Sequence, residues 1–183
     1  MKIIGFVNSN ESPKPSAGSR NWVMVLKGDS CLLNGRKPLF VPDWTNELGV
    51  TECLILRVSR LGKEIAPRFA NRYYDAVAPG ADFVAMDLLR EAQSTGKPWT
   101  EALAFDYSLA IGEWDEEYPS SGHQQSGLLL TPDEAIAAAS RVMTIRQGDL
   151  IYIQRAQAPR LVQKEEIIRV EKDGKDKLYC KIK

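Results

Sequence analysis

The chain has 183 residues, of which 44% are hydrophobic and 26% are charged, a composition typical of one soluble globular domain. Its 24 Lys and Arg residues balance 24 Asp and Glu residues, so no net field attracts nucleic acid or an anionic membrane, and neither is expected as a partner. The amino terminus lacks the apolar region of a signal peptide, and no apolar run reaches the roughly 18 residues of a membrane span, so a cytoplasmic location is expected.

Short runs of alternating apolar residues predict that strands dominate the chain. In chain order, the predicted strands are residues 2–7, 22–26, 39–41, 52–60, 105–111, 150–154, 166–171 and 178–182. Asn34-Gly35 and Asp173-Gly174 lie between such runs. Both predict hairpin turns, because the two central residues of a type I′ turn need positive φ.

Three short helices are predicted among these strands. The first covers residues 65–74, and the second covers residues 85–93 and is ended by Gly96 and the Lys-Pro pair after it. The third follows Thr131, which can cap its start, and Pro132 fits its first turn. Two acidic residues then complement the positive end of the helix, and an alanine-rich run continues it.

Two segments have the composition of loops. Residues 9–21 are rich in Ser and Pro, and residues 115–126 are acidic at first and then rich in Ser, Gly and Gln. Neither is long enough to separate two domains, and the chain contains no internal repeat. The sequence therefore predicts one β-rich α+β domain over residues 1–183, with a mixed β-sheet and a few short helices.

A series of short motifs runs in order through residues 22–153. They are Trp22-Val23-Met24-Val25-Leu26-Lys27, Asn34-Gly35, Phe40-Val41-Pro42, Arg57-Val58-Ser59-Arg60-Leu61-Gly62-Lys63-Glu64-Ile65, Gly80-Ala81-Asp82-Phe83-Val84-Ala85-Met86-Asp87, Gly96-Lys97-Pro98-Trp99, Ala102-Leu103-Ala104-Phe105-Asp106 and Ile145-Arg146-Gln147-Gly148-Asp149-Leu150-Ile151. Together they resemble the catalytic domain of the fumarylacetoacetate hydrolase family. The resemblance implies a β-roll core over residues 22–183, a shortened amino-terminal segment over residues 1–21, a homodimer, and a small carboxylic acid as ligand.

The resemblance also implies a metal site, because the family uses a hard divalent cation to polarise two oxygens of a 2-oxo or β-diketo acid. Two of its three carboxylate ligands come from an E-x-E pair on one strand, and these positions are Thr51 and Cys53 here. The third is retained as Asp82. One carboxylate is a poor cage for a strongly hydrated ion, so no cofactor is expected, whereas an active protein would need Mg²⁺ or Mn²⁺.

Other functional positions of the family are also substituted. The Arg, Gln and Lys positions are Met86, Leu89 and Leu103, and the T-G-T-P turn is Ile153-Gln154-Arg155-Ala156. The lid segment that brings a general-base His is Asn8-Ser9-Asn10-Glu11-Ser12, which has no His. The motifs that form the scaffold of the family match this sequence, whereas the motifs that form its active site are substituted.

The residual site candidates are Lys27, Asp82 and Asp106. Asp82 follows a Gly near a predicted helix start, so it either caps backbone N–H groups or keeps a residual metal contact. Glu52 lies between the two substituted ligand positions. A one-residue bulge would turn it into the site as a metal ligand, and otherwise it faces solvent or pairs with a base such as Arg57.

The remaining reactive side chains carry weaker signals. His123 is the only imidazole in the chain, and a surface position is favoured for it. Cys31, Cys53 and Cys180 are scattered, without a C-x-x-C pair, and are interpreted as free buried thiols. No base lies beside Cys53 in the sequence to lower its pKa.

Two hypotheses of different class follow. The favoured one is a catalytically degenerate protein that keeps the fold for binding or regulation. The alternative is an active Mg²⁺- or Mn²⁺-dependent hydrolase, isomerase or decarboxylase, in which Glu47, Glu52 or Asp106 joins Asp82 as a substitute ligand. Metal binding separates the two.

Overall fold

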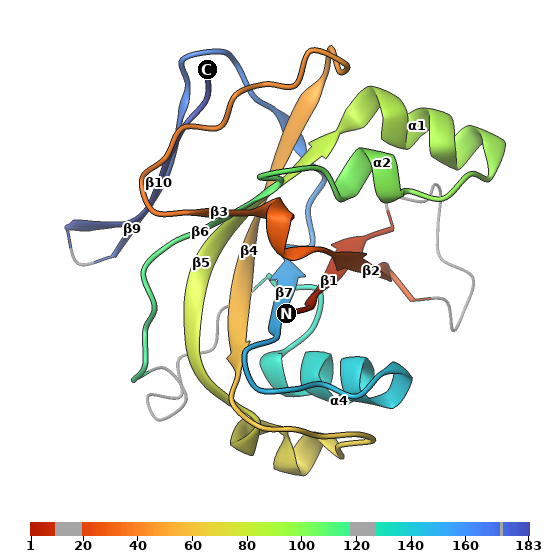
Figure 1. Cartoon of the computed structure of the whole chain (residues 1–183), viewed down its shortest axis with the longest axis vertical. Helices are drawn as coiled ribbons and strands as arrows, with labels where there is room; N and C mark the ends of the chain where they lie inside the picture. Colours follow the sequence, from red (N-terminus) through yellow and green to blue (C-terminus); the bar gives the residue numbers. More distant parts are fainter. Residues whose placement is uncertain (10–19, 118–126, 173) are drawn as a thin grey trace.

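A computed structural model describes residues 1–9, 20–117, 127–172 and 174–183. Its centre is a curled mixed sheet with the strand order β2-β1-β7-β4-β5-β6-β3, and β8 pairs with β4 outside this path (Figure 1). The strands of this sheet are β1 (Ile3–Asn8), β2 (Trp22–Lys27), β3 (Leu32–Asn34), β4 (Leu48–Val58), β5 (Tyr74–Ala85), β6 (Leu109–Ile111), β7 (Leu150–Gln154) and β8 (Arg160–Leu161). Strands β9 (Ile167–Lys172) and β10 (Lys175–Lys181) form a separate antiparallel hairpin. The predicted single, β-rich domain is confirmed.

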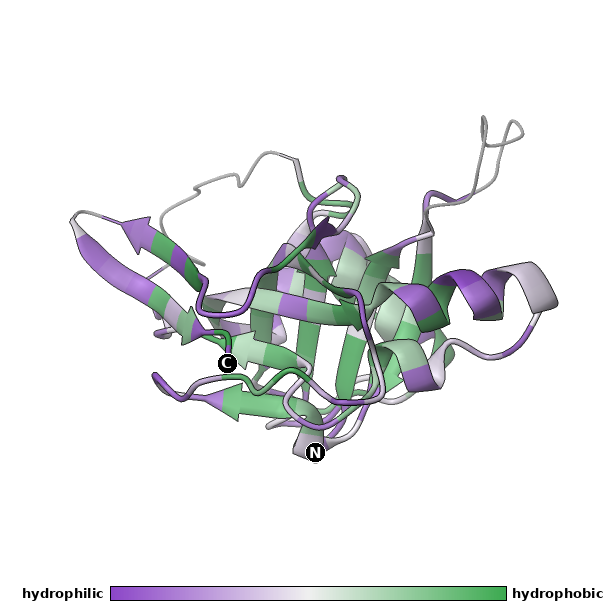
Figure 2. Ribbon diagram, turned by 90° about the horizontal axis from the view of Figure 1, so that it is seen from above, coloured by the Kyte–Doolittle hydropathy of each residue, from purple (hydrophilic) through white to green (hydrophobic). Residues whose placement is uncertain are grey.

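The core lies on both faces of the sheet. One apolar cluster fills the space between the sheet and α4 (Pro132–Val142), and a second packs near α1 (Met86–Thr95) and α2 (Thr100–Leu103). A third cluster joins the sheet to the β9–β10 hairpin. Figure 2 shows hydrophobic residues concentrated in the central strands, whereas hydrophilic and hydrophobic residues alternate in the hairpin and the outer side of α1 is hydrophilic.

The helix termini follow the sequence signals. Thr131 and Glu134 form a capping box at the start of α4, with Pro132 in its first turn. Gly96 ends α1 in the left-handed region, with φ 70°. Two 3₁₀ helices, η1 (Asp29–Cys31) and η2 (Pro67–Arg72), complete the elements. No helix in the described part of the chain is long and apolar enough to cross a membrane.

Several predicted elements were wrong in extent or type. The strand predicted at residues 39–41 is reduced to a single bridge between Leu39 and Ile182. The helix predicted at residues 65–74 is the shorter 3₁₀ helix η2, and β5, the longest strand, begins directly after it at Tyr74. Asn34-Gly35 is not a hairpin turn, because β3 pairs with β6 in parallel. The hairpin at Gly174 is confirmed, although Asp173 lies outside the described residues.

Asp149 connects the amino terminus to the start of β7. Its carboxylate accepts hydrogen bonds from the backbone N–H groups of Lys2 and Arg146, each at 2.9 Å, and from Lys2 Nζ at 2.5 Å. Burial alone would raise the pKa of this carboxyl, but the hydrogen bonds from Lys2 and Arg146 outweigh burial and lower it. The ionised form is therefore favoured in the folded state.

This arrangement predicts a pH-dependent contribution to stability. A carboxyl whose pKa is lowered by folding stabilises the protein above its unfolded pKa of about 3.9, and this stabilisation is lost as the pH falls through the folded pKa. Asp149→Asn should cost about 1.5–3 kcal/mol of unfolding free energy at pH 7. Urea denaturation of both proteins should show the difference shrinking below about pH 4. An equal difference at pH 7 and at about pH 3 would contradict this account.

Candidate functional site

A fully buried ion pair lies at the centre of the curled sheet. Lys27 Nζ is 2.6 Å from Asp82 Oδ1, and both side chains are 0% exposed. The ammonium also donates to the Ser108 backbone oxygen at 3.1 Å and to Ser108 Oγ at 2.9 Å. Gln154 Nε2 donates to the second carboxylate oxygen, Asp82 Oδ2, at 2.7 Å. Both oxygens of Asp82 are thus engaged by side chains of the chain itself.

Sheet curvature brings these groups together. Lys27 ends β2 and Asp82 lies within β5, four places away in the strand order. At about 4.8 Å between neighbouring strands, a flat sheet would separate them by about 19 Å. The short ammonium-to-carboxylate distance therefore requires the sheet to close on itself. Strand register brings Gln154 close to Asp82. On β4, Thr51 pairs with Asp82 of β5, and Cys53, two residues further on, pairs with Gln154 of β7.

The two substituted ligand positions point into this interior. Thr51 and Cys53 are buried, while Glu52 between them is exposed, as the alternation of a regular strand requires. Burial raises the pKa of the Cys53 thiol well above its ordinary value, and the negative charge of Asp82 raises it further. At neutral pH this thiol stays protonated, so it is neither a thiolate ligand nor a nucleophile.

Two buried hydroxyls lie beside the ion pair, those of Thr51 and Tyr152. Among the described residues, neither has a hydrogen-bond partner of acceptable geometry. The Tyr152 ring centroid is 5.6 Å from Lys27 Nζ. Burial raises the pKa of Tyr152 well above its ordinary value, and the nearby Asp82 charge acts in the same direction. The phenol therefore stays neutral in the folded protein.

Hydrocarbon surrounds this polar centre. Leu89 and Leu103, at two of the substituted family positions, pack in the same buried cluster as Cys53 and Tyr152. Met86, at a third, covers Gly49, where an added Cβ would lie 2.8 Å from the Met86 Cγ. These apolar side chains therefore pack in the cluster that also contains Cys53 and Tyr152.

The carboxylates that the sequence offered as substitute metal ligands lie away from Asp82. Glu52 is on the opposite face of β4, where it forms an ion pair with Arg155 at 2.9 Å rather than with Arg57, and the β4–β5 register is regular through this position. Glu47 pairs with Arg90 at 2.5 Å, and Asp106 is exposed. Within the described ranges, no three His, Cys, Asp or Glu side chains could hold a metal ion together.

The structure also changes the interpretation of Asp82 and adds residues that the motifs did not identify. Asp82 lies inside β5 and caps no helix. Ser108, which accepts hydrogen bonds from Lys27, was not among the predicted site residues, and Gln154, which donates to Asp82, was noted only as part of a substituted turn. Each is a polar residue next to a buried apolar run. His123 lies outside the described residues. The three cysteines are free and buried, as predicted.

Solved structures with a closely similar fold identify the architecture. A fumarylpyruvate hydrolase from Pseudomonas aeruginosa, in complex with Mn²⁺ and pyruvate, is 18% identical, with a TM-score of 0.79 over 99% of this chain and 88% of that chain. The 5-carboxymethyl-2-hydroxymuconate delta-isomerase from Mycobacterium smegmatis is 16% identical, with a TM-score of 0.80 over 99% of this chain and 78% of that one. A fumarylacetoacetate hydrolase family protein from Yersinia pestis is 20% identical, with a TM-score of 0.83 over 99% of this chain and 92% of that one. The chain has the fold of the fumarylacetoacetate hydrolase family. No protein-family model and no curated protein matches the sequence.

The fumarylacetoacetate hydrolase fold is thus combined here with a centre that does not fit a divalent cation. Mg²⁺ and Mn²⁺ need several oxygen ligands, with carboxylates among them. The described residues around Asp82 offer one carboxylate whose two oxygens are already engaged, a protonated thiol and hydroxyls. The Lys27 ammonium lies where added positive charge would be repelled.

Proposed function

We propose that this chain is a catalytically degenerate protein with the fumarylacetoacetate hydrolase fold, which it retains for binding or regulation as a homodimer. In this proposal the buried Lys27 ammonium neutralises Asp82 in place of a divalent cation. The observation that carries the proposal is the engagement of both Asp82 oxygens, by Lys27 at 2.6 Å and by Gln154 at 2.7 Å.

Electrostatics support this assignment. A carboxylate buried without a counter-charge is costly, so a site that has lost its metal needs another cation or must lose the carboxylate. Lys27 supplies one positive charge, and Ser108 accepts two of its hydrogen bonds. The resulting centre is neutral without a metal. Such a centre offers no Lewis acid to polarise a 2-oxo acid.

The alternative of an active metal enzyme gains no support from the substitute ligands. Glu47, Glu52 and Asp106 are all exposed or paired away from Asp82. The fumarylpyruvate hydrolase from Pseudomonas aeruginosa is in complex with Mn²⁺. That ion belongs to the other protein, and the side chains around Asp82 here do not reproduce a carboxylate cage for it.

Calorimetric titration with Mg²⁺ and Mn²⁺ tests the proposal. We expect no saturable uptake by the wild-type protein at metal concentrations of about 1 mM, because Asp82 has no free oxygen for an incoming ion. A dissociation constant in the micromolar range would contradict it. Asp82→Asn is the matched control: uptake that disappears in this variant would locate the metal at Asp82, whereas uptake that persists would be binding elsewhere on the surface.

A further inference from the structure

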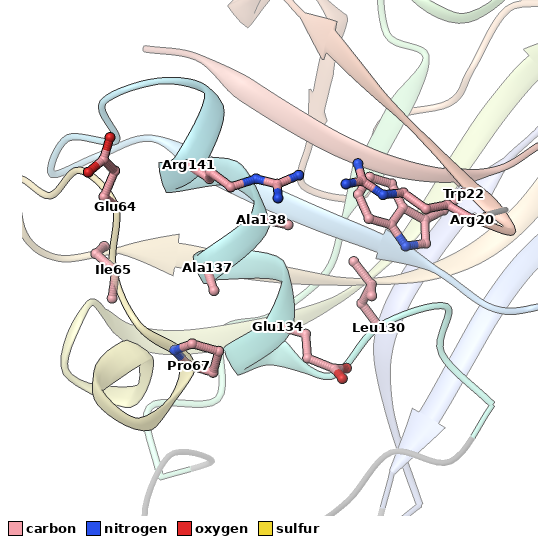
Figure 3. Close-up of a pocket in the computed structure, with 10 residues that line it drawn as sticks. All are labelled: Arg20, Trp22, Glu64, Ile65, Pro67, Leu130, Glu134, Ala137, Ala138 and Arg141. Carbon is pink, nitrogen blue, oxygen red and sulfur yellow. The ribbon is translucent and has the colours of Figure 1, made fainter. Parts of the chain in front are cut away.

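An open groove lies on the molecular surface, and none of its lining residues belongs to the Asp82 centre. It has a volume of about 570 Å³ and is lined by residues of β2, η2 and α4 and by the segments that precede them (Figure 3). This volume is within the roughly 300–1,000 Å³ of small-molecule sites. Its apolar lining includes Trp22, Ile65, Leu130, Ala137 and Ala138.

The walls of the groove are held in place by packing and capping. The Trp22 ring packs edge to face on the buried Phe6 ring, with centroids 5.0 Å apart and an interplanar angle of 83°. The capping box of Thr131 and Glu134 fixes the start of α4. Because these contacts are made within the chain itself, little ordering would be required for binding.

Two guanidinium groups face the groove. The Arg20 guanidinium carbon lies 4.8 Å from the Trp22 ring centroid. Arg141 extends from the last turn of α4, and Figure 3 shows its guanidinium directed over Ala138 towards Arg20 and away from Glu64. Within the described ranges, neither arginine forms an ion pair with a carboxylate.

The acidic residues of the groove do not neutralise these arginines. Glu134 Oε2 accepts hydrogen bonds from the Thr131 backbone N–H and hydroxyl, each at 2.8 Å, so this carboxylate is committed to the helix cap. Glu64 lies near Ile65, at the opposite end of the groove from Arg20 (Figure 3). The positive charges of Arg20 and Arg141 share the groove and repel each other, and an incoming carboxylate would relieve this repulsion.

We propose that this groove binds a small carboxylic acid with a flat apolar body. The carboxylate would lie between Arg20 and Arg141, where planar guanidinium groups can donate paired hydrogen bonds. The apolar body would cover Trp22, Leu130 and Ala138. The groove shares no residue with the Asp82 centre, so this inference holds or fails independently of the proposed loss of metal catalysis.

Titration calorimetry with 2-naphthoate tests the groove. The wild-type protein should show saturable binding below about 1 mM, whereas Arg20→Gln/Arg141→Gln should bind at least about tenfold more weakly, because charge-assisted hydrogen bonds are lost. The neutral analogue 2-naphthamide has nearly the same shape and should also bind at least about tenfold more weakly. Circular dichroism would establish that the double variant keeps the wild-type fold.

Arg90→Gln is the matched control, because Arg90 lies on α1 and pairs with Glu47 outside the groove. Its affinity for 2-naphthoate should stay within about twofold of the wild-type value. The inference is overturned if the wild-type protein shows no saturable binding up to about 10 mM. Equal affinity of the folded double variant, or equal affinity for 2-naphthamide, would overturn it as well.

Discussion

Replacing Lys27 by methionine should lower the free energy of unfolding by about 3–5 kcal/mol, because the substitution leaves the Asp82 carboxylate buried without its counter-charge. Methionine has nearly the length of lysine, so packing changes little and the effect reports the charge. Lys27 and Asp82 are both 0% exposed, and therefore water cannot replace the lost ammonium without opening the sheet. Equilibrium urea denaturation, followed by tryptophan fluorescence, measures the change.

Two further variants separate this charge effect from a general effect of losing a lysine. Lys97→Met removes an exposed lysine that pairs with Glu91, and should leave the free energy of unfolding nearly unchanged. Lys27→Met/Asp82→Asn removes both buried charges while keeping an acceptor for Gln154, and should recover much of the stability lost in the single variant. A double variant as unstable as Lys27→Met would show that the loss arises from packing instead.

Gly5→Ala should destabilise the protein by about 2–3 kcal/mol through overpacking. Gly5 pairs with Tyr152 across the parallel β1–β7 ladder, and the aromatic ring lies directly over the glycine. A methyl group at this position would overlap the ring at Cζ and the hydroxyl oxygen. Tyr152 is 0% exposed within a packed cluster, so the ring cannot move aside freely. Thermal and urea denaturation would measure the loss.

Gly28→Ala is the control for the loss of a glycine. Gly28 has an extended backbone with φ −76°, and the nearest atom to an added Cβ is Ser30 Oγ at 4.0 Å. Its substitution should change stability by less than about 0.5 kcal/mol. Tyr152→Leu should reduce the cost of Gly5→Ala, with a coupling of about 0.5–3 kcal/mol between the two sites. Additive effects in this pair would refute the steric explanation.

The Lys27–Asp82 pair also relates stability to the proposed loss of function. A divalent metal site concentrates negative oxygens, which repel one another until the ion binds. Here one carboxylate meets one ammonium, and leucine side chains pack in the apolar cluster that contains Cys53 and Tyr152. The charges of the pair balance without a metal. The same contacts that stabilise the pair occupy both oxygens of Asp82.

Local signals in the sequence were sufficient for several elements. Alternating apolar residues located β1, β2 and β7 to within a residue or so, because one-sided burial imposes a period of two. The capping residues around Thr131 located the start of α4, since they satisfy backbone N–H groups that any helix leaves free. The resemblance that matches Thr51 and Cys53 to the family's two Glu positions also needs only the sequence, and it stays a prediction.

Other elements depended on contacts that no local window contains. The β5 strand carries Pro79 and Gly80, which weaken a strand prediction, yet it pairs with β4 along its whole length. The segment at Phe40 and Val41 looks extended and apolar but lies outside the sheet, where Phe40 is 67% exposed. In both cases the presence or absence of a partner strand, and not the local preference for an extended conformation, decided whether the segment joined the sheet.

The sequence by itself determined which residue types stand at positions 51, 53 and 82, and of these only Asp82 carries a carboxylate. It did not determine what Asp82 contacts instead. Lys27 is 55 residues away along the chain and Gln154 is 72 residues away. Only closure of the curled sheet brings their polar atoms within hydrogen-bonding distance of Asp82. That closure depends on the pairing and twist of all the strands between them, which no local stretch of sequence specifies.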